Sequence, residues 1–277
     1  MYCTKYNLKH TYRVVAAGHH DTLKIQYLVT KCYGLSIADQ QSNQPDKRFS
    51  KPTCLKLGLR TLKCLQQLHE IGFIHRDIKP QVFVTDATEP QNIYIVHFGL
   101  ARRFRTRECA HLPRRPSLAL LGAVKYISRN AHKRNDRSQC DDIESWFYVL
   151  IEMFNRELLT WTDKTKEEEI RPEKEAFMTE RGFQKTTELC QSIPQAFFEI
   201  LRHINTLTFA AKPNFTRMRK VLKNEIEVND FKTEPYDWIK AEGKKIKCTD
   251  NDTSSRSEDI KSDVRSPVTS PPRVEPI

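Results

Sequence analysis

Residues 71–80 read Ile-Gly-Phe-Ile-His-Arg-Asp-Ile-Lys-Pro, and the interpretation of the whole chain starts from this stretch. A brief apolar strand at residues 73–74 leads into a polar run that holds one histidine, one arginine, one aspartate and one lysine. An isolated aspartate or lysine in a loop is usually just solvated. The meaning of this polar run therefore depends on the sequence around it.

A long amphipathic helix is predicted immediately before this stretch. Between Pro52 and Gly72, leucines recur at spacings of three and four, which is the period of one helix face. Pro52 suits a helix start and Gly72 a helix end. Further upstream, residues 12–17 and 24–30 are rich in strand-forming side chains and are separated by a turn-like stretch.

Downstream, the pattern changes from short strands to long helices. Two strands are predicted at residues 82–84 and 93–96. The stretch from 142 to 154 is apolar on nearly all faces, which is typical of a central buried helix. Amphipathic helices fit residues 195–206 and 215–225. Because a few short strands come first and long helices follow, the sequence predicts an α+β fold with a largely helical body.

Composition excludes several classes of protein. The chain has 277 residues, of which 38% are hydrophobic, enough for a buried core and unlike a wholly disordered or collagen-like chain. Its apolar runs are far too short to span a bilayer, so no membrane partner is expected. Eight scattered cysteines without a CxxC pair indicate reduced thiols in a cytoplasmic or nuclear protein. Residues 241–277 are rich in Ser, Thr and Pro, which predicts a disordered tail.

The segment at residues 71–80 resembles the catalytic loop of protein kinases. Twenty residues beyond Asp77, the sequence His-Phe-Gly-Leu-Ala-Arg resembles the Asp-Phe-Gly segment that begins a kinase activation loop. Motifs at residues 122–126, 130–132 and 141–145 follow in order, and together they resemble the casein kinase 1 family, most closely its tau-tubulin kinase branch. The resemblance covers roughly residues 11–240.

This resemblance implies a protein kinase-like α+β fold. It implies a mostly helical C-terminal lobe over residues 35–240, preceded at residues 1–34 by an incomplete N-terminal β lobe and the hinge. By alignment, the glycine-rich loop, the strand lysine and the helix glutamate of a kinase all lie upstream of Met1. Two explanations stay open: the gene product is short, or Met1 is not the native start.

The resemblance also assigns roles to individual residues. Asp77 would orient the attacking hydroxyl and Lys79 would stand beside the transferred phosphoryl group, while His75 and Arg76 would brace the loop. The hinge residues that would contact adenine, mainly through their backbone, are listed last: Thr30, Lys31, Cys32 and Tyr33.

Departures from the family pattern count against catalysis. Val82 stands where the family has a metal-binding asparagine, and His97 stands where it has the principal metal-binding aspartate. Magnesium prefers oxygen ligands, so we expect no protein metal ligands at these positions. Ala123 replaces a threonine whose hydroxyl ties the substrate-binding strand to Asp77 and Lys79. Although the family uses ATP and magnesium, we expect this chain to bind them weakly or not at all.

A basic segment offers a binding surface. Residues 101–139 hold eleven Lys and Arg against two acidic side chains, a balance of +9 out of the chain's +11. By resemblance, this segment would recognise acidic or phosphorylated protein segments through the bidentate fork of arginine. A solvated loop without a partner is the alternative, and nucleic acid is disfavoured because aromatics do not interleave with the arginines. The candidate anion-binding residues are Arg114, Arg115, Lys125 and Arg129.

Two functions follow from these observations. The first is a pseudokinase that keeps a helical lobe and a basic docking face. The alternative is an active or fragmentary serine/threonine kinase that transfers phosphate from ATP to protein Ser or Thr, because Asp77 and Lys79 are present.

Overall fold

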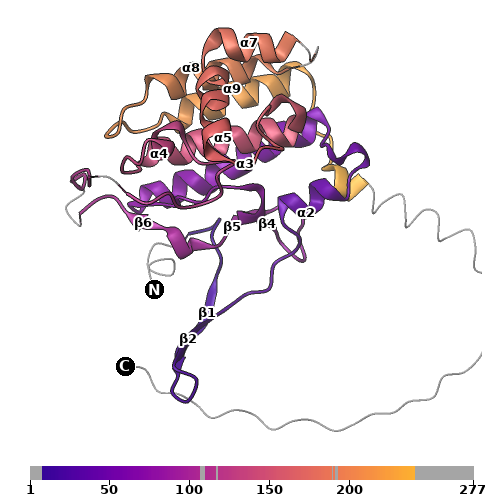
Figure 1. Cartoon of the computed structure of the whole chain (residues 1–277). Coiled ribbons are helices and arrows are strands. Elements are labelled where there is room, and N and C mark those ends of the chain that lie inside the picture. The colour runs from indigo at the N-terminus through magenta and orange to yellow at the C-terminus, as the bar shows by residue number, and fades with distance from the viewer. Residues whose placement is uncertain (1–7, 107–109, 117, 189, 191–192, 241–277) are drawn as a thin grey trace, which may run out of the picture. The chain divides into compact units, whose positions relative to one another are not determined.

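A computed structural model describes residues 8–106, 110–116, 118–188, 190 and 193–240 of the chain. Within this part, short strands precede a body of packed helices, as the sequence predicts (Figure 1). The predicted tail at 241–277 lies outside the described residues. Within the described part, no helix is long and apolar enough to cross a membrane.

Two antiparallel strands form a hairpin near the start of the described chain. β1 (Val14–His20) pairs with β2 (Ile25–Thr30), so the two predicted strands are confirmed with slightly shifted bounds. Every residue of β2 is exposed, including Leu28 at 50%. Figure 1 shows this hairpin extending away from the layered helices. The hairpin therefore adds little to the buried core, because the side chains on both of its faces are largely exposed.

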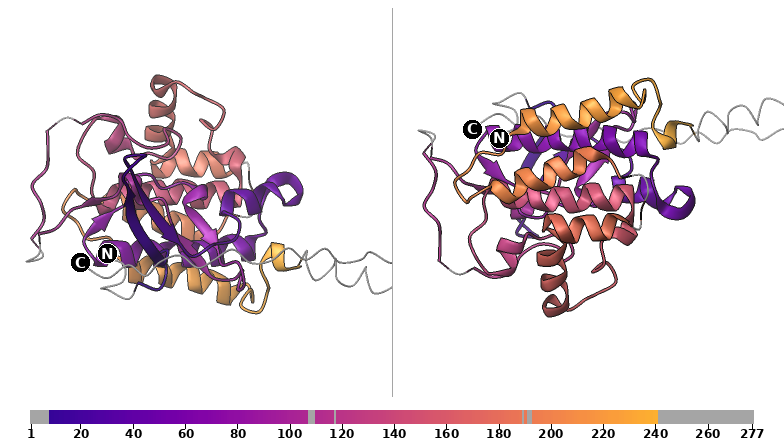
Figure 2. Two further views of the ribbon diagram at one scale, coloured as in Figure 1. Left: turned by 90° about the horizontal axis from the view of Figure 1, so that it is seen from below. Right: turned by 90° about the horizontal axis from the view of Figure 1, so that it is seen from above.

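The core of the protein is built from packed helices (Figure 2). α5 is the central one, and nearly all of its side chains are buried, as its apolar sequence predicts. Ser50 and Ser138 cap the first turns of α3 and α5 through their hydroxyls. The main helices are α3 (Lys51–Glu70), α5 (Gln139–Phe154), α8 (Gln195–Thr206) and α9 (Phe215–Val228).

Short strand pairs hold the polar loops in place. β3 (Phe73–Ile74) pairs with β6 (Arg102–Arg103), and β4 (Phe83–Thr85) pairs with β5 (Ile93–Ile95). These two pairs bring residues 75–82 alongside residues 96–101. Short 3-10 turns lie at Pro45–Lys47, Pro80–Val82, Phe98–Leu100 and Arg156–Leu158.

Several helices were not predicted from the sequence. The clearest is α6 (Glu167–Phe177), whose buried positions are Ile170, Lys174 and Phe177. These three have helical spacing, but the middle one is a lysine and Pro172 interrupts the helix, so the apolar period is hidden. The others are α2 (Ile37–Ser42), α4 (Arg129–His132) and α7 (Glu180–Glu188).

Candidate functional site

Asp142, on the central helix α5, anchors the polar loop. Its buried carboxylate accepts hydrogen bonds from His69 Nε2 at 2.9 Å and from the backbone N–H groups of His75 and Arg76 at 2.7 and 2.9 Å. Burial alone would raise the pKa of Asp142, but the hydrogen bond from His69 holds it below its ordinary value. This anchoring fixes the loop where Arg76 adopts a left-handed backbone with φ of 68°.

His75 and Arg76 brace the loop, as the resemblance implies. His75 Nε2 donates to the carbonyl of Val96 at 2.9 Å, and its Nδ1 accepts the N–H of Asp77 at 3.3 Å. The imidazole therefore carries its proton on Nε2. Burial lowers the pKa of His75 below its ordinary value, which favours this neutral form. Arg76 Nε donates to the carbonyl of Leu100 at 2.6 Å. Together these bonds join the loop to the segment that follows β5.

Asp77 lies between a lysine and a backbone amide. Its Oδ2 is 2.8 Å from Lys79 Nζ, and its Oδ1 accepts the N–H of Ala123 at 3.0 Å. Gly122 makes this approach possible, because it has a φ of 87° and a Cβ there would lie 2.9 Å from the carbonyl of Arg76. Ala123 lacks the hydroxyl that would bond to Asp77 and Lys79 in the family. Its backbone N–H still donates to Asp77, so the contact between the two segments is only partly lost.

The two expected metal positions do not fit magnesium. The Val82 side chain is fully buried in the hydrophobic core, and Gln81 beside it is exposed. His97 is exposed and has a left-handed backbone with φ of 65°. An isopropyl group and an imidazole offer no oxygen to a hard cation. Over the described residues, no cluster of three or more His, Cys, Asp or Glu side chains forms a metal site.

The hinge residues begin at Thr30, the last residue of β2, and are tied to the body by Lys31. Lys31 Nζ is 2.8 Å from Asp86 Oδ2, and this hydrogen bond holds the pKa of Asp86 well below its usual range. The backbone N–H of Lys31 donates to the carbonyl of Arg13 at 3.0 Å, so it is not free for a base. The Tyr33 hydroxyl accepts the N–H of Arg13 at 2.8 Å. Contacts of Thr30, Cys32 and Tyr33 with a nucleotide stay a prediction.

Comparison with known proteins identifies the family. The family model described as "Protein kinase domain" matches residues 7–223. The chain belongs to the protein kinase domain family. It is 30% identical over 229 residues to a probable serine/threonine-protein kinase of Dictyostelium discoideum, covering 82% of this chain and 44% of that protein. It is 30% identical over 226 residues to the serine/threonine-protein kinase spe-6 of Caenorhabditis elegans, covering 81% and 59%.

Membership of the family confirms the predicted kinase-like α+β fold with a helical C-terminal lobe and a small β portion. Kinase domains generally use ATP and magnesium and act on protein substrates. The chain spans about half the length of the curated relatives it matches.

In this kinase domain, much of the basic segment is paired internally. Buried Asp136 accepts from Arg102 Nη1 at 2.8 Å and from Arg115 Nη2 at 3.0 Å. Burial would raise the pKa of Asp136, but Arg115 and Arg102 hold it well below its usual range. Lys125 Nζ is 2.6 Å from Glu152. These cations look unpaired in the sequence, but each forms an ion pair with a carboxylate. Asp136 is buried within the segment, and Glu152 lies outside it.

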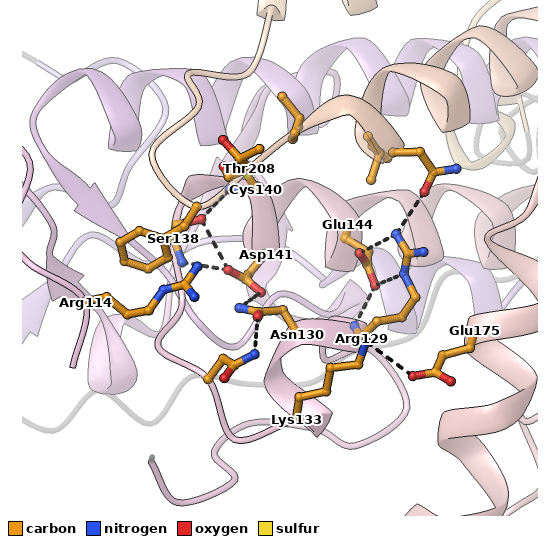
Figure 3. A pocket seen from close by; sticks show the side chains of 15 residues that line it. Arg114, Arg129, Asn130, Lys133, Ser138, Cys140, Asp141, Glu144, Glu175 and Thr208 are labelled. Carbon is orange, nitrogen blue, oxygen red and sulfur yellow. Dashed lines mark hydrogen bonds and ion pairs between the residues drawn. The ribbon is translucent and has the colours of Figure 1, made fainter. Parts of the chain in front are cut away.

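The other two anion candidates line a pocket of about 480 Å³ (Figure 3). Arg129 makes a bidentate pair with Glu144, with N–O distances of 3.2 and 3.1 Å. Arg114 is exposed, and its guanidinium lies 4.4 Å from the ring centre of Phe209. Of the four candidates, Arg114 is the one without a carboxylate partner among the described residues.

Lys174 supports the segment that follows Ala123, a role that the sequence does not indicate. Its Nζ donates to the carbonyls of Val124 and Ile127 at 2.8 and 2.7 Å and lies 3.3 Å from His132 Nε2. The side chain is fully buried, and burial lowers the pKa of Lys174 to about 7. No local signal reveals it, because lysine at a helix position is usually solvated.

Proposed function

We propose that this kinase domain is a pseudokinase of the casein kinase 1 group, in its tau-tubulin kinase-like branch, and that it binds protein partners with an acidic or phosphorylated segment. The observation that carries the proposal is the pair Val82 and His97 at the two metal positions. The proposed organisation is an N-lobe portion and hinge at 1–34, a helical lobe at 35–240 and a tail at 241–277. A cytoplasmic or nuclear location is part of the proposal.

Missing metal ligands weigh heavily against phosphoryl transfer. The reaction depends on positioning and on neutralising the charge that develops on the phosphate oxygens. Loss of one electrostatic stabiliser costs roughly 10²–10³ in rate. Val82 points into the core, so a small local shift does not place an oxygen there, and His97 lacks a carboxylate. Asp77 and Lys79 alone do not replace this neutralisation.

The retained loop supports a binding role. Asp142, His75 and Arg76 hold the loop in one conformation, and the amide of Ala123 holds the neighbouring segment against Asp77. Such a framework positions the segment beside Ala123, which includes Lys125 and Arg129, before a partner binds, and this lowers the entropy cost of binding.

A nucleotide thermal-shift titration, with and without magnesium or manganese, tests the proposal. A ligand that binds only the folded state raises its apparent stability, and we expect no increase that depends on metal. Replacing His97 by Asp should introduce a metal-dependent shift, and the matched His97→Asn, whose amide oxygen carries no charge, should give a smaller one. Both replacements tolerate the left-handed backbone at this position.

The second candidate function is a working serine/threonine kinase that transfers phosphate from ATP to protein Ser or Thr. It is favoured by the close pairing of Asp77 with Lys79 and by the names of the two relatives. A radiolabel transfer assay on an acidic peptide distinguishes the two. Transfer that is abolished by Asp77→Asn would establish the second function and refute the first.

Arg114 is the side chain through which the basic segment is best placed to bind an anion. It is exposed, while Arg115, Lys125 and Arg129 each have a carboxylate partner that an incoming phosphate must displace. We expect Arg114→Ala to weaken binding of a phosphoserine peptide several-fold in fluorescence anisotropy. The matched Arg181→Ala on α7 should leave binding unchanged.

A further inference from the structure

A second basic surface lies between α3 and α9, and neither the charge pattern of the sequence nor the catalytic loop accounts for it. It is a groove of about 690 Å³. Its cationic side chains, here called its walls, are on the whole more exposed than its apolar side chains, here called its floor. The cations are Lys56, Arg60, Lys63, Arg219, Lys223 and Lys232, and the apolar residues are Leu59, Ile226, Tyr236 and Ile239.

The packing of the two helices brings these cations together. α9 lies alongside α3 (Figure 2). Lys51 in the first turn of α3 pairs with Glu225 late in α9 at 3.2 Å, while Gln66 late in α3 accepts from Arg219 early in α9 at 3.3 Å. The helices are therefore antiparallel, and each presents a basic row to the same groove. On α3 the row has spacings of four and three, which keeps it on one helix face.

The cations of this groove lack acidic partners. Among residues 8–240 as described, none of the six forms an ion pair with a carboxylate. Two acidic side chains, Glu227 and Glu234, also line the groove, and Glu234 is occupied by Lys240. Burial lowers the pKa of neighbouring His10, and Arg60 and Lys63 lower it further. Lys56 also donates to the backbone carbonyl of Glu234. Because the six cations outnumber the two carboxylates, the groove carries a net positive charge.

The floor of the groove is apolar. Ile226 and Tyr236 are buried at the base, and Leu59 and Ile239 pack against the core while partly exposed. The ring of Tyr236 stacks on Trp238 with centres 4.6 Å apart, so it is not free to stack on a base. A concave basic groove without a free aromatic platform fits a peptide better than a nucleic acid strand or a flat bilayer surface.

We propose that this groove docks an acidic peptide segment of a partner protein, with carboxylates on the two basic walls and an apolar side chain on the floor. The row from Lys56 to Lys63 spans about 10 Å along α3. An extended peptide covers that length with about three residues, so a short linear motif fills the groove. The groove contains no residue of the catalytic loop or of the basic segment, so a peptide can dock there whether or not the domain transfers phosphate.

Fluorescence anisotropy with the full chain and a labelled peptide tests this proposal. The probe is fluorescein-Glu-Glu-Leu-Glu-Glu-Leu-Glu. The test variant is Lys63→Glu with Lys223→Glu, two side chains that make no ion pair among the described residues. The control is Arg181→Glu with Lys185→Glu on exposed α7, which changes the net charge equally. Thermal melts confirm that both variants fold.

The groove variant should bind the probe about tenfold more weakly or worse, and the control should bind like the wild type. Replacing the probe's leucines by serine should also weaken binding, because the floor is apolar. Equal weakening in both variants, or no binding of the probe to the wild type, would overturn the proposal. It would also be overturned if oligo-dT or phosphatidylserine vesicles bound more tightly than the peptide and lost binding in the groove variant.

Discussion

The basic segment at residues 101–139 and the groove between α3 and α9 differ in what their cations contact. In the segment, Arg102, Arg115, Lys125 and Arg129 are all held by carboxylates. Their three acceptors are buried Asp136, which two arginines share, and Glu144 and Glu152 of the central helix α5. In the groove, six cations line one cavity and none forms an ion pair with a carboxylate among the described residues; Lys56 and Arg219 donate only to uncharged oxygens. A surplus of charge along the sequence is therefore a poor measure of charge that is available to a ligand.

The difference also separates structural from functional charge. Cations that pair with buried carboxylates fix the conformation of the segment, and losing one partner leaves a buried charge unpaired. Exposed cations without partners repel one another slightly and persist at some cost to stability. The second kind is the better indicator of a binding surface, and the following variants test this contrast.

The largest effect is expected at the centre of the paired region. Replacing Asp136 by Ala removes the carboxylate that Arg102 and Arg115 share in a buried site. We expect the free energy of unfolding to fall by about 2–3 kcal/mol, after allowance for the partial exposure of both arginines. Urea unfolding followed by circular dichroism measures it. A loss below about 0.5 kcal/mol, the range of ordinary surface changes, would show that the pairing is not structural.

An intermediate, pH-dependent effect is expected at Lys174. Its folded pKa of about 7 lies below its ordinary value, so above pH 7 the unfolded chain binds more protons than the folded one. Stability should therefore rise between pH 7 and pH 9, relative to Lys174→Met, by on the order of 2 kcal/mol. Glu144 and Glu167 oppose this shift, and His132, whose own pKa is lowered by burial, faces the ammonium.

Chemical unfolding at several pH values measures this contribution as the difference between the two proteins. Exposed Lys223, on the groove, provides the matched control, because Lys223→Met should run parallel to the wild type over the same range. A wild-type curve parallel to that of Lys174→Met would contradict the depressed pKa.

The smallest effect is expected in the groove. Lys63→Ala and Lys223→Ala each remove a cation without an ion-pair partner in the described structure. The free energy of unfolding should therefore change by no more than about 0.5 kcal/mol. We expect a slight increase in stability, because each substitution removes a charge that repels its neighbours. Differential scanning calorimetry measures it. Losses as large as that of Asp136→Ala would remove the contrast between the two regions.

Most of the fold was predictable from local patterns. The leucine period before Gly72, the apolar run at 142–154 and the amphipathic period at 195–206 each predict a helix that the structure contains. α6 was missed because one of its three buried positions is Lys174, which hydrophobic periodicity counts as exposed. α7 was missed because only two of its described positions, Phe183 and Thr187, are buried.

The candidate site was only partly predictable. The sequence places His75, Arg76, Asp77 and Lys79 in one loop, and the structure shows how they are fixed. The sequence gives no sign that Asp142, 65 residues beyond Asp77, accepts hydrogen bonds from two backbone N–H groups of the loop. It also does not show that Ala123 keeps contact with Asp77 through its backbone amide, because a backbone bond is independent of the side chain.

Residue identity and local spacing were enough to indicate the family motifs, the order of strands and helices, and the Val82 and His97 side chains at the two expected metal positions. These are properties of residue identity and of spacing along one segment. Tertiary structure alone decided which charges are free. Salt-bridge partners such as Lys51 with Glu225, and the groove that joins α3 to α9, depend on residues far apart in the chain meeting in space. Coulomb interactions depend on distance in space and not on separation in sequence, so the basic segment is partly paired by carboxylates, while the cations of the groove form no ion pair in the described structure.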